Sequence, residues 1–156
     1  MSRRSVVSRR RALAAAGSAL SVAVAGCTGS SDENTNSDDR QQLRPEDWED
    51  VEEIRLQAHM RGFYGVEPAM IEDVRNPALL LFEGNEYEIT WENGDGVPHN
   101  FAVRDESGAT VDGISTRRMR ERGQTQSVTV TATGEMHRYL CEPHPGTMTG
   151  YVHVRD

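Results

Sequence analysis

Residues 139–152 read YLCEPHPGTMTGYV, and this stretch decides how the rest of the chain is interpreted. Apolar and β-prone residues at both of its ends predict two strands, and the segment between them is a short loop. Cys141, His144 and Met148 lie in that loop, where two prolines and a glycine limit the backbone conformations. Because the loop is short, the three side chains can converge on one point. The stretch therefore predicts a compact site at one end of a strand pair.

Strand patterns continue outward from this stretch through the second part of the chain. Apolar and polar residues alternate with a period of two, which is typical of half-buried strands, and no stretch sustains a helical stripe. Turn signals of Gly, Asn, Asp and Ser separate the candidates. The expected strands are 54–58, 78–82, 87–91, 101–104, 127–132, 136–140 and 151–155. This spacing predicts an all-β fold, a Greek-key two-sheet β-sandwich, with a helical turn expected within the irregular residues 111–122.

The N-terminus predicts export. Residues 8–11 (SRRR) precede an apolar stretch, residues 12–25, that is too short and too rich in Ala, Gly and Ser for a membrane-spanning helix. The paired arginines resemble a twin-arginine export signal. Residues 24–27 (VAGC) resemble a lipobox, at which a peptidase cleaves before the cysteine that carries lipid. We expect residues 1–26 to be a signal peptide and Cys27 to anchor the exported protein at the extracytoplasmic face of the cell membrane. An uncleaved anchor helix and a plain cleaved signal are the alternatives.

A polar segment follows the lipobox. Residues 28–42 contain no aliphatic or aromatic residue and are rich in Ser, Asn and Asp, so they bury too little apolar surface to offset the entropy of ordering. We expect residues 27–50 to form a disordered acidic tether, with a short helical turn between Leu43 and Val51. Apolar residues are concentrated after residue 50, which predicts one folded domain at 51–156.

The charge of the chain excludes one class of partner. The formal charge is −8, and removal of residues 1–26 takes away five arginines and no acid, which leaves −13. A protein that binds nucleic acid needs a basic surface to displace counterions, so nucleic acid is not an expected partner. All 17 basic residues are arginine. An acidic chain without lysine is typical of a halophilic protein, whose surface carboxylates are screened by concentrated salt, although genome composition also produces such a bias.

A lipidated Cys27 leaves Cys141 without a disulfide partner. A single thiol in an oxidising compartment requires a reason, and metal coordination supplies one because it shields the thiolate from disulfide exchange. A second histidine, His99, lies in the segment VPHNF at the start of an expected strand. One thiolate, two imidazoles and one thioether form a mixed ligand set that suits both Cu(I) and Cu(II). The candidate metal ligands, around one copper ion, are His99, Cys141, His144 and Met148.

With these residues in place, the sequence resembles the cupredoxins, the type 1 blue copper proteins, and most closely their plastocyanin- and halocyanin-like members. The resemblance covers roughly residues 52–156. It rests on HNF beginning at His99, on C-x-x-H-x-x-x-M beginning at Cys141, and on the closing GYVHV. It implies that the two histidines and the cysteine bind copper in one plane and that the methionine is the axial ligand. In this chain those residues are His99, Cys141, His144 and Met148.

The resemblance also implies a role for Asn100, which would brace the two ligand loops near the thiolate. One feature departs from the family. Three residues separate His144 from Met148, whereas plastocyanins have four and amicyanin-like loops two, so the axial distance stays open. Met136 is an alternative axial donor. The other histidines, expected on the surface or at a strand edge, are His59, His137 and His153.

The resemblance implies a monomeric one-electron carrier that shuttles between respiratory redox partners of a membrane electron-transport chain. The alternative is a copper-binding or copper-delivery module without an electron-shuttle role, for which more exposed ligands and methionine-rich clusters are expected. Catalysis is not expected, because a site with four protein ligands leaves no position for a substrate. No catalytic residue is therefore predicted.

Overall fold

The structure is a computed structural model and describes residues 43–156. The expected signal peptide (1–26), the lipobox cysteine Cys27 and the expected tether up to residue 42 lie outside the described residues. Within 43–156, no helix has the length and hydropathy needed to cross a membrane. The helices in this part are two short 3-10 turns, η2 (Pro45–Asp47) and η3 (Ala69–Ile71). The first confirms the helical turn expected between Leu43 and Val51.

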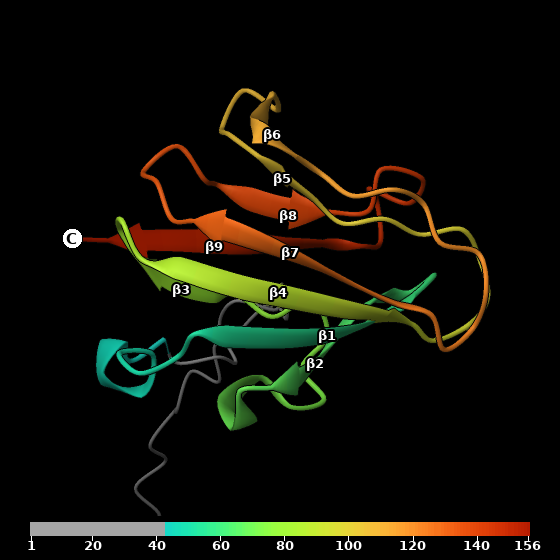
Figure 1. The fold of residues 1–156 in the computed structure, drawn as a ribbon, viewed down its shortest axis with the longest axis horizontal. Coiled ribbons are helices and arrows are strands. Elements are labelled where there is room, and N and C mark those ends of the chain that lie inside the picture. The colour runs from blue at the N-terminus through green and yellow to red at the C-terminus, as the bar shows by residue number, and fades with distance from the viewer. Residues whose placement is uncertain (1–42) are drawn as a thin grey trace, which may run out of the picture. The chain divides into compact units, whose positions relative to one another are not determined.

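In the described part, nine strands form the two sheets of a β-sandwich (Figure 1). The first sheet has the order β2 (Gly62–Glu67), β1 (Glu53–His59), β4 (Glu86–Asn93) and β7 (Thr125–Thr131). The second sheet has the order β3 (Leu79–Phe82), β9 (Thr149–Arg155), β8 (Arg138–Leu140), β5 (Ala102–Arg104) and β6 (Thr110–Ser115). β1 pairs with β4 and β3 with β9 in parallel, and the other neighbours are antiparallel. The predicted all-β, two-sheet sandwich is confirmed.

The alternating pattern of the sequence explains which side chains form the core. Along β4, Tyr87, Ile89 and Trp91 are buried, whereas Glu86 and Glu88, which alternate with them, are exposed. β1 follows the same alternation over its seven residues. Successive side chains of a strand point to opposite faces, so each of these strands contributes one apolar face to the interior.

Three aromatic rings connect the two sheets next to the predicted site. The Phe63 ring, from β2 in the first sheet, lies 5.9 Å from that of Phe101 and 5.5 Å from that of Tyr139, measured between centroids. Phe101 and Tyr139, both from the second sheet side, stack at 5.4 Å, and all three rings are fully buried. Phe101 is two residues from His99, and Tyr139 is two residues from Cys141. The cluster therefore fixes both ligand segments to the core.

Two boundaries differ from the sequence-based expectation. The segment 111–122 contains no helical turn, because its first residues belong to β6 and the backbone of Met119 pairs with His99 instead of with its own segment. The folded part also begins before residue 51. Trp48 is only 1% exposed and belongs to the core, so the boundary at residue 51 was wrong by several residues. An indole of this size contributes enough buried apolar surface to order the residues beside it.

Gly150→Ala tests the packing of β9 against the aromatic cluster. A β-carbon at Gly150 would collide with the ring of Tyr139, whose hydroxyl is held by a 2.8 Å hydrogen bond to the Pro77 carbonyl. We expect the free energy of unfolding to fall by about 2 kcal/mol in a urea titration, because overpacking a rigid core is costly. Gly134→Ala is the control, since a β-carbon there meets only ordinary contacts. Equal stability of the two variants would show that the Tyr139 ring moves aside.

Candidate metal centre

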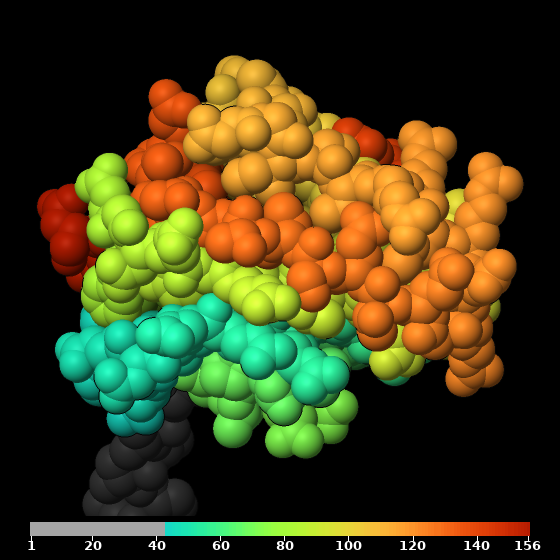
Figure 2. Space-filling view, viewed as in Figure 1, coloured from blue at the N-terminus to red at the C-terminus, as the bar shows by residue number. Residues whose placement is uncertain are grey.

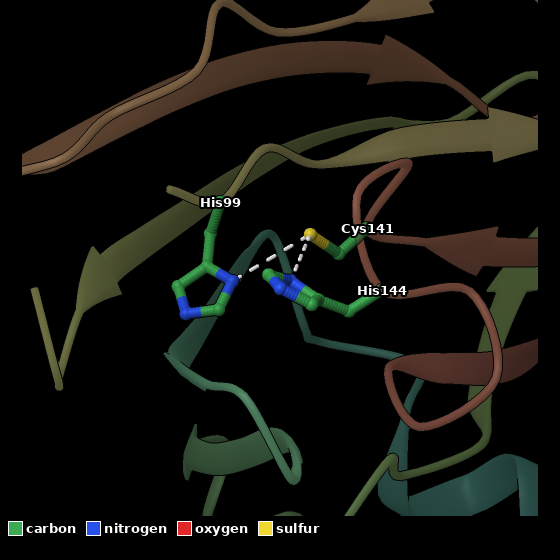
Figure 3. Close-up of side chains that lie close together, drawn as sticks. All are labelled: His99, Cys141 and His144. Atoms are coloured by element: carbon green, nitrogen blue, oxygen red, sulfur yellow. Dashed lines mark hydrogen bonds between the residues drawn. The ribbon is translucent and has the colours of Figure 1, made fainter. Parts of the chain in front are cut away.

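Two loops at the same end of the sandwich bring three predicted ligands together. His99 lies in the loop between β4 and β5, and Cys141 and His144 lie in the loop between β8 and β9 (Figure 3). The Cys141 sulfur is 3.6 Å from Nδ1 of His99 and 3.7 Å from Nδ1 of His144. One donor atom from each of the three side chains lies within 4.8 Å of the others. The two imidazoles therefore face the thiol with the same ring nitrogen.

Backbone hydrogen bonds shape the second of these loops. The His144 N–H donates to the Cys141 carbonyl at 3.0 Å, and the Met148 N–H donates to the His144 carbonyl at 2.9 Å. The Cys141 N–H donates to the Met148 carbonyl at 3.0 Å, which closes the loop. Met148 is fully buried, as is Cys141, whereas His144 is half-buried. The loop thus holds the thiol inside and leaves one imidazole at the surface.

His99 is held on both its backbone and its ring. Its N–H and carbonyl exchange hydrogen bonds of 3.0 and 2.8 Å with the backbone of Met119. On the ring, Nε2 lies 2.9 Å from Oδ1 of Asp95. Since Nδ1 faces the Cys141 sulfur, Nε2 is the nitrogen that carries the proton and donates to the carboxylate. The Asp95 side chain therefore sets both the tautomer and the direction of the ring.

Asp95 also connects this site to the turn between β1 and β2. Its Oδ1 accepts the Val97 N–H at 2.9 Å, and its Oδ2 accepts the Met60 N–H at 2.7 Å. The carbonyl of Met60 accepts the Thr147 hydroxyl at 2.7 Å, and Thr147 lies in the other ligand loop. One turn residue thereby contacts both ligand loops. Burial raises the pKa of the Asp95 carboxyl, but the hydrogen bonds from Val97, Met60 and His99 outweigh it, and the net pKa is lowered.

A second connection between the loops runs through Asn100. Its Oδ1 accepts the Glu142 N–H at 2.9 Å, and its Nδ2 donates to the Glu142 carboxylate at 2.8 Å. The same carboxylate forms an ion pair with Arg104 of β5. Burial raises the pKa of Glu142, but Arg104 and Asn100 outweigh it and the pKa lies below its ordinary value of 4.5. Asn100 is therefore the residue that joins the His99 loop to the Cys141 loop.

The site is poor in water and favours neutral side chains when no metal is bound. Burial raises the pKa of the Cys141 thiol, although the backbone N–H groups of Asn100 and His144 and the charge of Arg118 oppose the rise. Burial also lowers the pKa of His99, against the effect of Asp95. A bound cation would reverse the preference at the thiol, because a coordinated thiol is deprotonated.

The remaining sequence candidates lie elsewhere. Met136 precedes β8 and Cys141 follows it, so the strand separates them and Met136 is at the wrong end to be an axial donor. The ring of His59 is hydrogen-bonded to Gln57, and no described histidine other than His99 and His144 joins the cluster of donor atoms. The sequence alone does not identify Asp95 as a partner of His99, because NGDG at 93–96 predicts only a turn. An acid four residues before the ligand histidine is the pattern that indicates such a partner.

Residues 82–155 match a family model described as copper binding proteins, plastocyanin/azurin family. The matched segment is nearly half of the chain and contains all four residues predicted to bind the metal. No curated protein matches the chain.

Solved structures of two copper proteins match the chain. A methionine-to-leucine variant of rusticyanin is 18% identical, and the match covers 66% of this chain and 76% of that one with a TM-score of 0.51. A variant of amicyanin in the Cu(I) form is 24% identical, with 67% of this chain and 83% of that one covered and a TM-score of 0.43. The rusticyanin likeness bears on the fold alone.

The donor atoms fit one copper ion. Two imidazole nitrogens and one sulfur suit copper in both of its common oxidation states. His99 and Cys141 are fully buried, and their donor atoms, 3.6 Å apart, are close enough to share one ion. When bound, copper supplies the ability to gain and lose one electron. The protein's own residues orient the rings and exclude water.

Asp95→Asn removes the negative charge behind His99 and keeps the size of the side chain. We expect Cu(II) affinity to fall about tenfold, as losses of such supporting groups typically do. If the loss falls on Cu(II) alone, the reduction potential rises by about 59 mV. A chelator competition and cyclic voltammetry measure the two quantities. Glu88→Gln removes the same charge near the start of β4 and is expected to change neither. An unchanged Cu(II) affinity in Asp95→Asn would contradict the role of the carboxylate.

Glu142→Gln tests the connection between the loops through pH. The Glu142 pKa is lowered, so its stabilising effect is present above about pH 4.5 and is lost as the pH falls through the folded-state pKa. We expect the free energy of unfolding at pH 7 to fall by about 0.5–1 kcal/mol, a small value because exposed ion pairs are weak; the Glu142 side chain is 33% exposed. In urea titrations at successively lower pH, the difference in stability between the variant and the wild type should shrink and disappear below the folded-state pKa of Glu142. A difference that does not shrink as the pH falls would point to lost packing instead.

Proposed function

We propose that the described domain is a cupredoxin and that this protein is a one-electron carrier with a type 1 copper site. His99, Cys141 and His144 would hold the copper ion, and Met148 would supply a fourth, weaker donor. The observation that carries the proposal is the Cys141 sulfur at nearly equal distances, 3.6 and 3.7 Å, from two imidazole nitrogens. The full burial of Met148 in the same loop supports its role.

The surroundings of the donors support electron transfer with little rearrangement. His99 is hydrogen-bonded on backbone and ring, and the loop of the other donors is closed by its own backbone bonds. Ligands that are held in this way stay in place when copper changes its charge, and a small rearrangement favours fast transfer. The half-buried His144 is the donor nearest to solvent and the natural contact for a partner. The proposal assigns no catalytic residue.

The alternative of a copper-delivery module is less favoured. Delivery requires that a metal leaves for another protein, and accessible donors assist this exchange. His99 and Cys141 have no exposed surface, and Asp95 and Asn100 hold their loops in place. This burial favours a resident ion over a transferred one.

We further propose that the carrier is exported by the twin-arginine route and held at the extracytoplasmic membrane face by lipid on Cys27. The segments SRRR at 8–11 and VAGC at 24–27 support this proposal. A tether of about 20 residues would let the domain move between membrane-bound redox partners, since tethering raises the effective concentration without new contacts. The absence of lysine supports a halophilic habitat, and a monomer suits a mobile carrier.

A titration with Cu(II) tests the proposed function. The metal-free protein is expected to take up one equivalent and to turn intensely blue, because a short thiolate–copper bond produces a strong charge-transfer band. Cys141→Ser should remain colourless. Met148→Leu should stay blue with a higher reduction potential, since loss of a weak axial sulfur ligand destabilises Cu(II).

Met136→Leu is the matched control for the axial ligand. We expect its spectrum and potential to equal those of the wild type, because Met136 lies beyond the far end of β8. Blue colour in Cys141→Ser, or a pale product in the wild type, would refute the type 1 site. A potential that shifts in Met136→Leu and not in Met148→Leu would reassign the axial ligand.

A further inference from the structure

Residues 117–122 read RRMRER and form a basic segment, here called the arginine loop, in a strongly acidic domain. Residues 43–156 contain 11 arginines and 21 acids, a formal charge of −10, yet four of these arginines fall within the six residues of the loop. All four arginines are exposed. None of them takes part in an ion pair within the described residues, whereas Arg44, Arg55 and Arg104 do. Their charge is therefore available to a partner.

The arginine loop is attached directly to the proposed copper site. Its central residue, Met119, exchanges two backbone hydrogen bonds with His99, and the Met119 carbonyl also accepts the Asn93 amide at 3.1 Å. In Figure 1 the orange β6–β7 connection follows the yellow β4–β5 loop around one end of the domain, and in Figure 2 its side chains project from that end. A partner that approaches the copper end therefore meets the arginines.

Three acids lie at this end, and each has a partner. Asp95 accepts three hydrogen bonds, and Glu142 is paired with Arg104. Glu121, within the arginine loop, accepts the Gln124 amide at 3.0 Å and leaves the loop with a net charge of +3. A group of acids lies at the opposite end of β1 and β4, around a surface depression. Its rim contains Glu49, Glu52, Glu53, Glu86 and Glu88, of which Glu53 is paired with Arg55 at 3.9 Å. β4 has eight residues, so the two groups of charge are separated by roughly 25 Å along the strand. The domain is therefore an electric dipole with its positive end at the copper site.

We infer that the arginine loop is the docking surface for an acidic face of a redox partner protein, which it places against the copper end of the domain. The inference rests on the proposed electron-carrier function and adds the charge of its partner. A basic partner would be drawn to the acidic rim, far from the copper site, where electron transfer is slow. An acidic partner face is drawn to the end at which transfer takes place.

An acidic protein fits this surface better than an anionic membrane. The formal charge of −10 repels a negatively charged bilayer as a whole. The loop is thus directed toward protein partners.

Salt determines the range over which the arginines act. The Debye length is about 8 Å at physiological ionic strength and about 3 Å at 1 M salt. In concentrated salt, long-range attraction is screened, but guanidinium groups still form bidentate contacts with carboxylates at hydrogen-bond distance. The docking surface therefore provides steering in dilute salt and orientation in concentrated salt.

The experiment uses the full-length copper-loaded protein and, as probe, a strongly acidic plant-type [2Fe–2S] ferredoxin. R117Q/R118Q/R120Q removes three charges from the arginine loop. R44Q/R55Q/R155Q removes three charges from arginines that are equally exposed elsewhere. Stopped-flow absorbance measures the rate constant for reduction of the blue protein by reduced ferredoxin. Calorimetry with both proteins oxidised measures binding without electron transfer.

At low salt we expect the rate constant to fall at least about tenfold in the loop variant, with a matching loss of affinity in calorimetry. The control variant should stay within about twofold of the wild type, and the difference should shrink as salt rises. Equal losses in both variants would overturn the inference, since they would report total charge. The inference would also be overturned if the loop variant binds ferredoxin as the wild type does but no longer cosediments with phosphatidylglycerol vesicles. That result would indicate a lipid surface as the partner.

The outcomes separate the docking surface from the proposed function. If the wild-type protein does not turn blue with Cu(II), or if ascorbate does not bleach it, the electron-carrier function is refuted. Calorimetry then still tests whether the arginine loop binds ferredoxin. A blue, reducible protein whose ferredoxin affinity is the same in the wild type and the loop variant would refute the docking surface alone.

Discussion

The sulfur of Cys141 lies between two imidazole rings that come from different loops, and this convergence is the constraint on which the rest of the domain depends. The thiol lies within hydrogen-bond distance of both ring nitrogens, so the neutral buried groups satisfy one another. This arrangement lasts only while the two loops are held together. The sandwich supplies this support through the rings of Phe63, Phe101 and Tyr139, which fix the starting points of both ligand segments to the core.

Polar contacts complete what the aromatic packing begins. Asp95 directs the ring of His99, and Asn100 joins the two ligand loops through Glu142. None of these residues is a proposed metal ligand. They would influence the energies of the two copper oxidation states indirectly, by fixing the positions of the ligands and by their own charge. The arginine loop belongs to the same arrangement, because the backbone that supports His99 also places the arginines beside the site. The coordination of the metal and the recognition of a partner are thus linked by one pair of backbone hydrogen bonds.

The sequence predicted the elements that depend on local pattern. Alternation at 54–58 and 87–91 predicted β1 and β4, and the spacing within 141–148 predicted that Cys141 and His144 would meet. It did not predict contacts that depend on tertiary placement. Asp95 was interpreted as part of a turn because its partner Met60 lies 35 residues away. Trp48 was assigned to the tether because its acidic neighbours conceal a buried indole. The helical turn expected within 111–122 failed because Met119 takes its hydrogen bonds from His99.

The turn at Met60 has one further consequence. Its N–H reaches Asp95 beside His99, and its carbonyl reaches Thr147 in the loop of the other donors. A single residue of a third segment, Met60, therefore contacts both ligand loops. Opening of the β1–β2 hairpin would free both loops from this contact at once. Local fluctuations of the domain should then expose the copper ligands cooperatively, as one unit, instead of letting them fray one at a time. Resistance to loss of the ion is in this sense a property of the hairpin as much as of the donors.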